Sequence, residues 1–189
     1  MRSVTPLFCG LLCLLTLPGA RAADAPAKSL PAATAGAPHC PRVGDAAPPF
    51  GITMDDGSDG VSLREALSHK RPVVIDFFSW HCVPCRKELP ALQQLSAELA
   101  GKATFVLVHL DGSEAQMKRM LGDLHVTLPA ASASMADAES RPEVQKRYCV
   151  NNIPLLLILD AKGIVRASIE GGRNDFKQAV RSAVALAGR

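Results

Sequence analysis

From about residue 43 onward, apolar residues follow two kinds of pattern along the chain. Short continuous runs of β-branched, aromatic and leucine side chains are typical of buried strands, and apolar residues three or four positions apart are typical of helices with one buried face. The runs predict strands over residues 73–78, 104–110, 155–159 and 164–169. The spaced apolar residues predict helices over residues 83–100, 113–124, 140–148 and 174–186.

The order of these segments predicts an α/β fold. Residues 50–54 and 61–63 flank the turn signal Asp55-Asp56-Gly57, which indicates a β-hairpin ahead of the main alternation. Strands then alternate with helices, and a second hairpin and a last helix capped by Asn174 close the chain. This order is typical of a mixed central sheet flanked by helices.

The first 42 residues do not have the pattern of a folded domain. Residues 1–22 combine a positive start at Arg2, an apolar run and a small-residue cleavage site ending at Ala22, as in a secretory signal peptide. Because the apolar run is about half the roughly 20 residues that span a bilayer, an uncleaved membrane anchor is the weaker alternative. Residues 23–42, mostly Ala, Pro, Gly, Ser and Thr, are expected to form a flexible tether. One globular domain follows over residues 43–189, and its export predicts a periplasmic location.

Composition narrows the classes of partner. The 189 residues are 48% hydrophobic, which is enough for one domain with a full core, and the formal net charge is only +3. The sequence has no basic run and no aromatic-rich basic patch, so we expect no nucleic acid partner. Cleavage after Ala22 would remove Cys9 and Cys13 and leave four of the six cysteines, an even number that suits an oxidising compartment.

The segment Cys82-Val83-Pro84-Cys85 carries the candidate chemistry. Thiol–disulfide exchange begins when a thiolate attacks a disulfide sulfur, and a helix start favours the thiolate of Cys82 through its free NH groups and its dipole. Cys85 lies one helical turn further on and can resolve a mixed disulfide, while Pro84 stiffens the turn. The alternatives are a static disulfide and half of a zinc site. A four-ligand zinc site needs a second ligand pair, and the sequence has no second CxxC and no HxxxH, so we expect no metal and no cofactor.

Two ionisable residues stand close to these cysteines in the sequence. Asp76 interrupts an apolar strand, and burial is expected to raise its pKa, which suits a proton acceptor for Cys85. The alternative is a core aspartate that is hydrogen-bonded to backbone. His81 precedes Cys82 and can add positive potential or titrate near neutral pH, although an exposed loop histidine without a role fits equally well.

The remaining cysteines raise the question of a second disulfide. Four mature cysteines allow three fully paired connectivities. The two-residue spacing and the helix start assign Cys82 to Cys85, which leaves Cys40 and Cys149 in an oxidising compartment. We predict a structural disulfide between Cys40 and Cys149 that attaches the tether to the domain. The alternative is that Cys40 stays free and forms intermolecular bonds.

The order of elements and these motifs together resemble the thioredoxin superfamily, most closely its secreted TlpA/ResA-like branch. The resemblance covers residues 43–187. Residues 43–50 are similar to the opening segment of that branch, and residues 73–90 to its strand, active-site turn and kinked helix. Residues 148–154 are similar to the segment that carries the family's cis-proline, and Gly171-Gly172 falls where the family has glycine before the last helix.

The resemblance implies the thioredoxin fold and several residue roles. It implies a cis peptide bond before Pro154, which lets the preceding backbone pair with a bound substrate peptide. Thioredoxins carry an aspartate six residues before the first cysteine, as Asp76 does here, although Leu107 takes the place of their partner lysine. The residues expected to dock substrate are Trp80, His81, Val83, Pro84 and Ile153.

Three positions depart from the usual pattern of this branch. His81 stands where a tryptophan is usual, Leu155 stands where a threonine follows the cis-proline, and Cys149 stands where a small residue is usual. Because the first two positions lie where substrates dock, they leave the identity of the partner open and do not affect the expected chemistry.

The leading interpretation is an enzyme that reduces disulfides of extracytoplasmic proteins. The resemblance implies a membrane donor of reducing equivalents and a purpose in cytochrome c or cytochrome oxidase biogenesis. One alternative is a peroxiredoxin-like peroxidase, but the P-x-x-x-[ST]-x-x-C pattern of that class is missing before Cys82. Another is a copper chaperone, but related copper carriers use C-x-x-x-C with a distal histidine, and the spacing here is one residue shorter.

Overall fold

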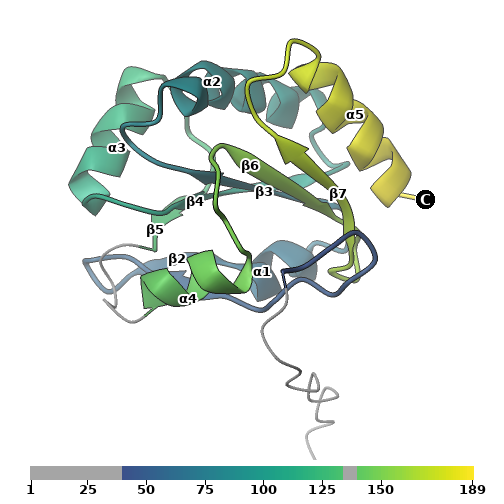
Figure 1. The fold of residues 1–189 in the computed structure, drawn as a ribbon, viewed down its shortest axis with the longest axis horizontal. Helices are drawn as coiled ribbons and strands as arrows, with labels where there is room; N and C mark the ends of the chain where they lie inside the picture. Colours follow the sequence, from purple (N-terminus) through teal and green to yellow (C-terminus); the bar gives the residue numbers. More distant parts are fainter. Residues whose placement is uncertain (1–39, 134–139) are drawn as a thin grey trace, which may run out of the picture. The chain divides into compact units, whose positions relative to one another are not determined.

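The computed structural model describes residues 40–133 and 140–189, which contain a five-stranded sheet and a two-stranded sheet. The larger sheet has the strand order β5-β4-β3-β6-β7 (Figure 1). Its strands are β3 Val73–Phe78, β4 Thr104–His109, β5 Ala130–Ser132, β6 Leu155–Leu159 and β7 Val165–Glu170. Strands β3, β4 and β5 are parallel, whereas β6 runs antiparallel to β3 and β7 antiparallel to β6. The sheet is therefore mixed, as predicted.

Helices cover both faces of this sheet (Figure 1). One face carries α2 (Val83–Glu98), α3 (Glu114–Asp123) and α5 (Phe176–Ala187). The other face carries α1 (Leu63–Ser68), α4 (Ser140–Arg147) and the hairpin of β1 (Gly51–Thr53) and β2 (Asp59–Ser62). The predicted fold class and N-terminal hairpin are confirmed. Within the described ranges, no helix combines the length and the apolarity needed to cross a membrane.

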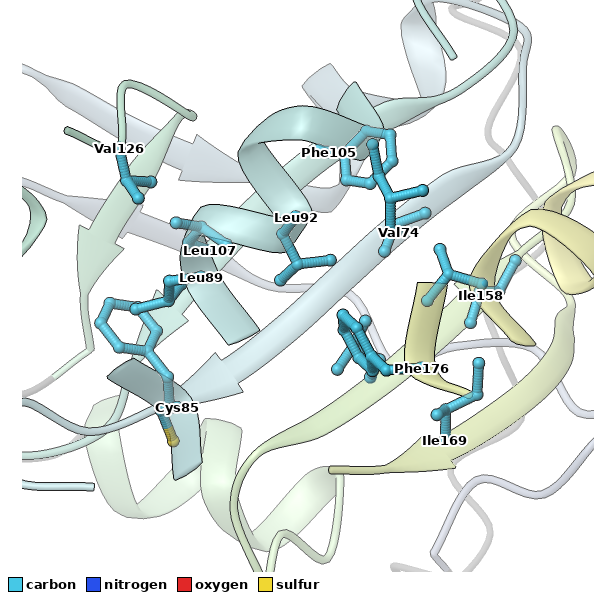
Figure 2. Packing of buried hydrophobic residues seen from close by; sticks show 14 of the residues in the cluster. Val74, Cys85, Leu89, Leu92, Phe105, Leu107, Val126, Ile158, Ile169 and Phe176 are labelled. Carbon is cyan, nitrogen blue, oxygen red and sulfur yellow. The ribbon is translucent and has the colours of Figure 1, made fainter. Parts of the chain in front are cut away.

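Alternating side chains of the central strands build two separate cores, one on each face of the sheet. On β3, Val74 and Phe78 join the core that α2, α3 and α5 cover, and Figure 2 shows Val74 in this core. Helix α2 contributes a buried stripe to this core, with Leu92 near its centre. Because Asp76 lies midway between Val74 and Phe78, it faces the same core, which also contains Cys85.

Two expectations from the sequence need correction. The sequence analysis misses β5, because its three residues are small and form no apolar run; only pairing with β4, from Leu107 to His109, makes it a strand. The prediction that Asn174 caps α5 is wrong. The N-cap is Asp175, whose carboxylate bonds the guanidinium of Arg173 and not the NH groups of the helix.

Residues 40–50 are tied to the domain by backbone and side-chain contacts. The NH of Val165, at the start of β7, donates to the carbonyl oxygen of Asp45 at 2.9 Å. The buried Tyr148 donates its hydroxyl to the carbonyl oxygen of Pro48 at 2.5 Å. The segment ahead of the hairpin is therefore part of the folded domain.

A disulfide joins Cys40 to Cys149, with an S–S distance of 2.01 Å. The two cysteines are 109 positions apart, and Cys149 follows the end of α4 in a left-handed backbone conformation with φ of 50°. The bond connects the start of the described chain to the loop between α4 and β6. The predicted signal peptide, residues 1–22, and the tether up to residue 39 lie outside the described residues, so those boundaries stay predictions.

We expect the Cys40–Cys149 bond to stabilise the domain, because cross-linking so long a loop restricts the unfolded chain. The chain-entropy model gives an upper value of about 4–5 kcal/mol. Replacing both cysteines by alanine should lower the free energy of unfolding in urea by about 2–4 kcal/mol. The matched control, Cys82→Ala with Cys85→Ala, opens a much shorter loop and should cost less. Unchanged stability of the first variant, or free thiols at both positions in peptide maps, would contradict this role.

Candidate active site

The two cysteines of the CxxC segment stand at the start of α2. Cys82 is the N-cap residue, and the NH of Cys85 donates to its sulfur at 3.2 Å. The two sulfurs are joined in a disulfide, with Cα atoms 5.3 Å apart. Pro84 lies in the first turn, where a missing NH removes no helical hydrogen bond. Cys82 keeps 8% exposure and Cys85 has none, so Cys82 is the more accessible of the two cysteines.

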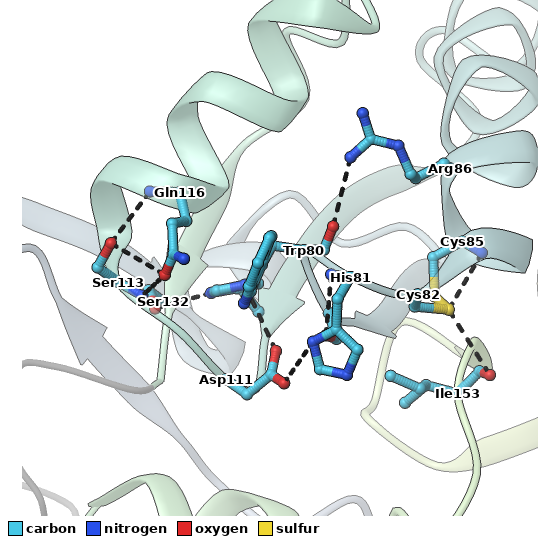
Figure 3. A network of polar contacts seen from close by, with 12 residues as sticks. Trp80, His81, Cys82, Cys85, Arg86, Asp111, Ser113, Gln116, Ser132 and Ile153 are labelled. Carbon is cyan, nitrogen blue, oxygen red and sulfur yellow. Dashed lines mark hydrogen bonds and ion pairs between the residues drawn. A yellow bond between two sulfur atoms is a disulfide. The ribbon is translucent and has the colours of Figure 1, made fainter.

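The surroundings of Cys82 favour a thiolate when the disulfide is reduced. Its sulfur lies at the positive end of a helix of 16 residues. The NH of Arg86 donates to the carbonyl oxygen of Cys82 at 3.2 Å, and the Arg86 guanidinium turns to the carbonyl oxygen of Trp80, to which its Nη1 donates at 3.3 Å (Figure 3). Because the thiolate is the attacking species in disulfide exchange, this geometry makes Cys82 the candidate nucleophile.

A second segment approaches Cys82 from the loop before β6. The Ile153–Pro154 peptide bond is cis, and the carbonyl oxygen of Ile153 lies 3.8 Å from Cys82 Sγ (Figure 3). Gly171 packs on the ring of Pro154 so closely that a Cβ atom there would lie 2.1 Å from Pro154 Cγ. Contacts from the end of β7 therefore place the backbone of Ile153 beside the reactive sulfur.

Asp76 lies on the sheet face that packs against the dithiol helix, with 2% exposure. Its neighbours in the strand register are Leu107 on β4 and Leu156 on β6, so neither register neighbour is a lysine. Asp76 Oδ1 has no hydrogen-bond partner within residues 40–133 and 140–189. Burial, and to a smaller degree the nearby Glu88 carboxyl, raise the pKa of Asp76 well above its ordinary value. The protonated form is therefore favoured.

Glu88 is a candidate site residue that the sequence analysis missed. It lies one turn after Cys85 with 8% exposure, and its Oε1 accepts the NH of Gly172 in the loop before α5. Its Oε2 has no hydrogen-bond partner in the described part of the chain, and burial raises the pKa of this carboxyl. The available signal was its spacing. Glu88 lies three residues after Cys85 and four before Leu92, on the buried stripe of α2.

His81 belongs to a polar network beside the dithiol (Figure 3). Its Nδ1 lies 2.9 Å from Ser79 Oγ and 3.0 Å from Asp111 Oδ2. Asp111 Oδ1 in turn lies 3.8 Å from Nε2 of the fully buried His109, whose Nδ1 contacts Ser132 Oγ at 2.9 Å. These contacts connect the loop before the dithiol to the ends of β4 and β5, so His81 is not an isolated loop residue.

Apolar side chains stand on both sides of the reactive sulfur. Trp80 is 37% exposed and Val83 is 63% exposed. The Trp80 ring meets the His81 ring edge-on, with centroids 5.6 Å apart. It also lies close to Gly112, where a Cβ atom would stand 2.4 Å from Trp80 Cδ1. The dithiol therefore has an accessible apolar rim suited to contact with a polypeptide.

Together these groups can carry out a two-electron thiol–disulfide exchange. An accessible thiolate can attack, a buried thiol can resolve the mixed disulfide, and buried carboxyl groups can accept and return the proton. Among the described residues, no cluster of three or more His, Cys, Asp or Glu side chains could hold a metal ion. The fold and the dithiol define the class of thioredoxin-fold thiol–disulfide oxidoreductases.

The chain belongs to the Thioredoxin-like family, whose sequence profile matches residues 70–165. It is 26% identical over 132 residues to the thiol-disulfide oxidoreductase ResA of Oceanobacillus iheyensis. The matched region covers 69% of this chain and 66% of ResA. It is 30% identical over 126 residues to the thioredoxin-like protein YneN of Bacillus subtilis. Here the matched region covers 65% of this chain and 68% of YneN. The predicted resemblance is confirmed, and the chain matches about two thirds of the length of each relative.

Solved structures agree with this assignment. A thiol:disulfide interchange protein of the thioredoxin family from Chlorobium tepidum has a TM-score of 0.59 at 26% identity, covering 76% of this chain and 97% of that protein. The thioredoxin domain of a thiol-disulfide oxidoreductase from Bacteroides vulgatus has a TM-score of 0.65 at 23% identity, covering 76% and 98%. At 23% identity, the likeness to the Bacteroides vulgatus domain concerns the fold alone.

The difference in exposure between the two cysteines predicts which one reacts first. In a Cys40→Ala, Cys149→Ala background, a limiting amount of iodoacetamide at pH 6 should alkylate reduced Cys82 at least about tenfold faster than Cys85, because the thiolate is the reactive form. Peptide mapping by mass spectrometry gives the ratio. Cys85→Ser should trap mixed disulfides with substrates, and Cys82→Ser should not. Faster labelling of Cys85 would reverse the assignment.

The raised pKa values of Asp76 and Glu88 predict a pH-dependent stability of the oxidised protein. Between the unfolded and the folded pKa, the folded state binds more protons, so the free energy of unfolding falls as pH rises, by at most about 1.4 kcal/mol per pH unit per carboxyl. Asp76→Asn should remove part of this fall. In urea titrations, the free energy of unfolding of this variant should therefore exceed that of the unmodified protein by an amount that grows from pH 4 to pH 9. The exposed control Asp123→Asn should follow the unmodified curve. If the difference in free energy of unfolding between Asp76→Asn and the unmodified protein stays constant from pH 4 to pH 9, Asp76 is not a buried acid with a raised pKa.

Proposed function

We propose that this protein reduces disulfides of extracytoplasmic proteins through the Cys82–Cys85 dithiol. The observation that carries the proposal is a disulfide between a cysteine at a helix start that keeps some exposure and a fully buried cysteine one turn later. In this scheme the Cys82 thiolate attacks one sulfur of the substrate disulfide. The substrate bond breaks, a mixed disulfide forms on Cys82, and the other substrate sulfur leaves as a thiolate that takes a proton.

The second half of the reaction uses the buried groups. Of the buried acids Asp76 and Glu88, one is protonated and the other is the carboxylate that accepts the proton of Cys85. The Cys85 thiolate then attacks Cys82 Sγ. The mixed disulfide breaks, the second substrate thiolate leaves, and the Cys82–Cys85 disulfide forms. Two electrons have passed from the dithiol to the substrate. Pro154 keeps the backbone of Ile153 beside Cys82 Sγ during both steps.

The buried acids also support the direction of the reaction. A dithiol becomes a strong oxidant when its reduced form is stabilised. Here Glu88 lies one helical turn after Cys85, and Asp76 faces the core that contains Cys85. Neither carboxyl group makes an ion pair within the described residues. A negative charge on either carboxyl group disfavours a thiolate on the nearby cysteines, so it destabilises the reduced form relative to the disulfide. A dithiol whose disulfide is favoured in this way acts as a reductant.

Substrate docking follows from the groups that surround Cys82. A substrate peptide would pair with the backbone of Ile153 by β-augmentation. Its apolar side chains would contact Trp80 and Val83, which are exposed, and the ring of Pro84. His81, held by Asp111, would shape the same surface at the position before the nucleophile.

The location and the purpose rest on further observations. The signal peptide pattern and a disulfide outside the active site both suit an oxidising compartment outside the cytoplasm. A membrane donor of reducing equivalents would reduce the Cys82–Cys85 disulfide again after each turnover. By resemblance to the TlpA/ResA-like branch, the proposed substrates belong to cytochrome c or cytochrome oxidase biogenesis.

The reduction potential of the Cys82–Cys85 couple tests the proposed direction. In a Cys40→Ala, Cys149→Ala background, equilibration with glutathione or dithiothreitol buffers reports this couple alone. We expect a value near that of thioredoxin, about −270 mV. A value near about −120 mV, the range of strong oxidants, would overturn the reductase proposal.

A further inference from the structure

A groove opens directly beside the dithiol, between α2 and the start of α5. Its volume is about 700 Å³, which is the size of sites that enclose drug-sized ligands or short peptide stretches. Val83 and Pro84, the two residues between the active-site cysteines, form one end of its lining. A polypeptide whose sulfur is bound at Cys82 can therefore continue into this groove.

Positive charge lines the groove from both walls. Lys87 comes from α2, and Arg173, Lys177 and Arg181 come from the α5 side. Arg173 is paired with Asp175 and Arg181 with Glu98 on α2.

The two lysines are different from the two arginines. Lys177 donates to the neutral side-chain amide of Gln94, and within the described residues neither Lys87 nor Lys177 forms an ion pair. One uncompensated cation therefore remains on each wall.

The start of α5 and Glu88 add donors for an anion to the groove. The start of α5 lines the groove near Glu88, whose Oε1 accepts the NH of Gly172. The N-cap side chain of this 12-residue helix makes no capping bond, so its first NH groups and its dipole can interact with negative charge. Glu88 also lines the groove, with 8% exposure, and its Oε2 has no partner in the described ranges. In its protonated form, which burial favours, Glu88 can donate a hydrogen bond to a carboxylate.

We propose that this groove binds an acidic segment of the protein substrate, with Asp or Glu side chains next to the cysteine that reacts with Cys82. The inference rests on the proposed function and adds the chemical class of the preferred substrate. Lys87 and Lys177 act as specificity-determining residues: they attract the acidic side chains, and the start of α5 with Glu88 receives their carboxylates. Such attraction raises the rate of productive encounter and is weakened by salt.

The test uses three peptide substrates that differ only in charge. Each joins two short peptides by one disulfide and carries a fluorophore and a quencher, with Glu-Glu, Gln-Gln or Lys-Lys on each side of the cysteine. The second-order rate constant with pre-reduced protein is measured at low salt and at 0.5 M NaCl. We expect the Glu-Glu peptide to react about tenfold faster than the Gln-Gln peptide at low salt, with the Lys-Lys peptide slowest and the differences shrinking at high salt.

Matched variants assign the preference to the groove. In Lys87→Gln with Lys177→Gln, the three rate constants should come within about twofold of one another. Lys102→Gln, an exposed control beyond the C-terminal end of α2, should keep the full preference. Equal rates for all three peptides, or a preference for Lys-Lys, would overturn the groove proposal while the reductase stands. Failure to reduce any peptide would overturn the proposed function, and with it this inference.

Discussion

The packing of α2 on the sheet decides where the two sulfurs stand. Leu89, Leu92 and Leu95 are fully buried in the core between the sheet and α5, and Figure 2 shows Leu89 and Leu92 in this core. Burying each such side chain contributes about 1.5–3 kcal/mol, so the stripe holds the helix far more firmly than its first turn could. With the helix held in this way, its N-cap residue Cys82 keeps some exposure, and Cys85, one turn later, is fully buried. The accessible Cys82 and the buried Cys85 follow from this one contact.

The same packing buries two carboxyl groups, leaving Asp76 2% and Glu88 8% exposed. Asp76 comes from the sheet and Glu88 from the helix that covers it, and neither has an ion-pair partner among the described residues. A buried acid of this kind costs stability whenever it ionises. It is also able to hold or release a proton beside the sulfurs, so the property that weakens the fold is the one that the proposed exchange uses.

The loop that approaches Cys82 is positioned from both ends. On its N-terminal side, Cys149 is tied to Cys40 by a disulfide, and Tyr148 is bound to the chain ahead of the hairpin. On its C-terminal side, Pro154 packs on Gly171 and leads into β6. The Cys40–Cys149 disulfide therefore helps to position this loop, whereas the Cys82–Cys85 disulfide stands at the start of α2.

The sequence by itself determined the elements whose pattern is local. Long apolar runs made β3, β4 and β6 predictable, helical spacing made α2 predictable, and the two-residue spacing of Cys82 and Cys85 indicated the chemistry. The three residues of β5 were not predictable, because a strand of small side chains exists only through its pairing with β4. Glu88 looked like an ordinary helix residue, and its bond to Gly172, 84 positions away, exists only after α2 and α5 have packed. The groove between α2 and α5 likewise exists only after these helices have packed. Periodicity records which face of an element is buried, whereas tertiary packing alone decides which distant residues share the space around that face.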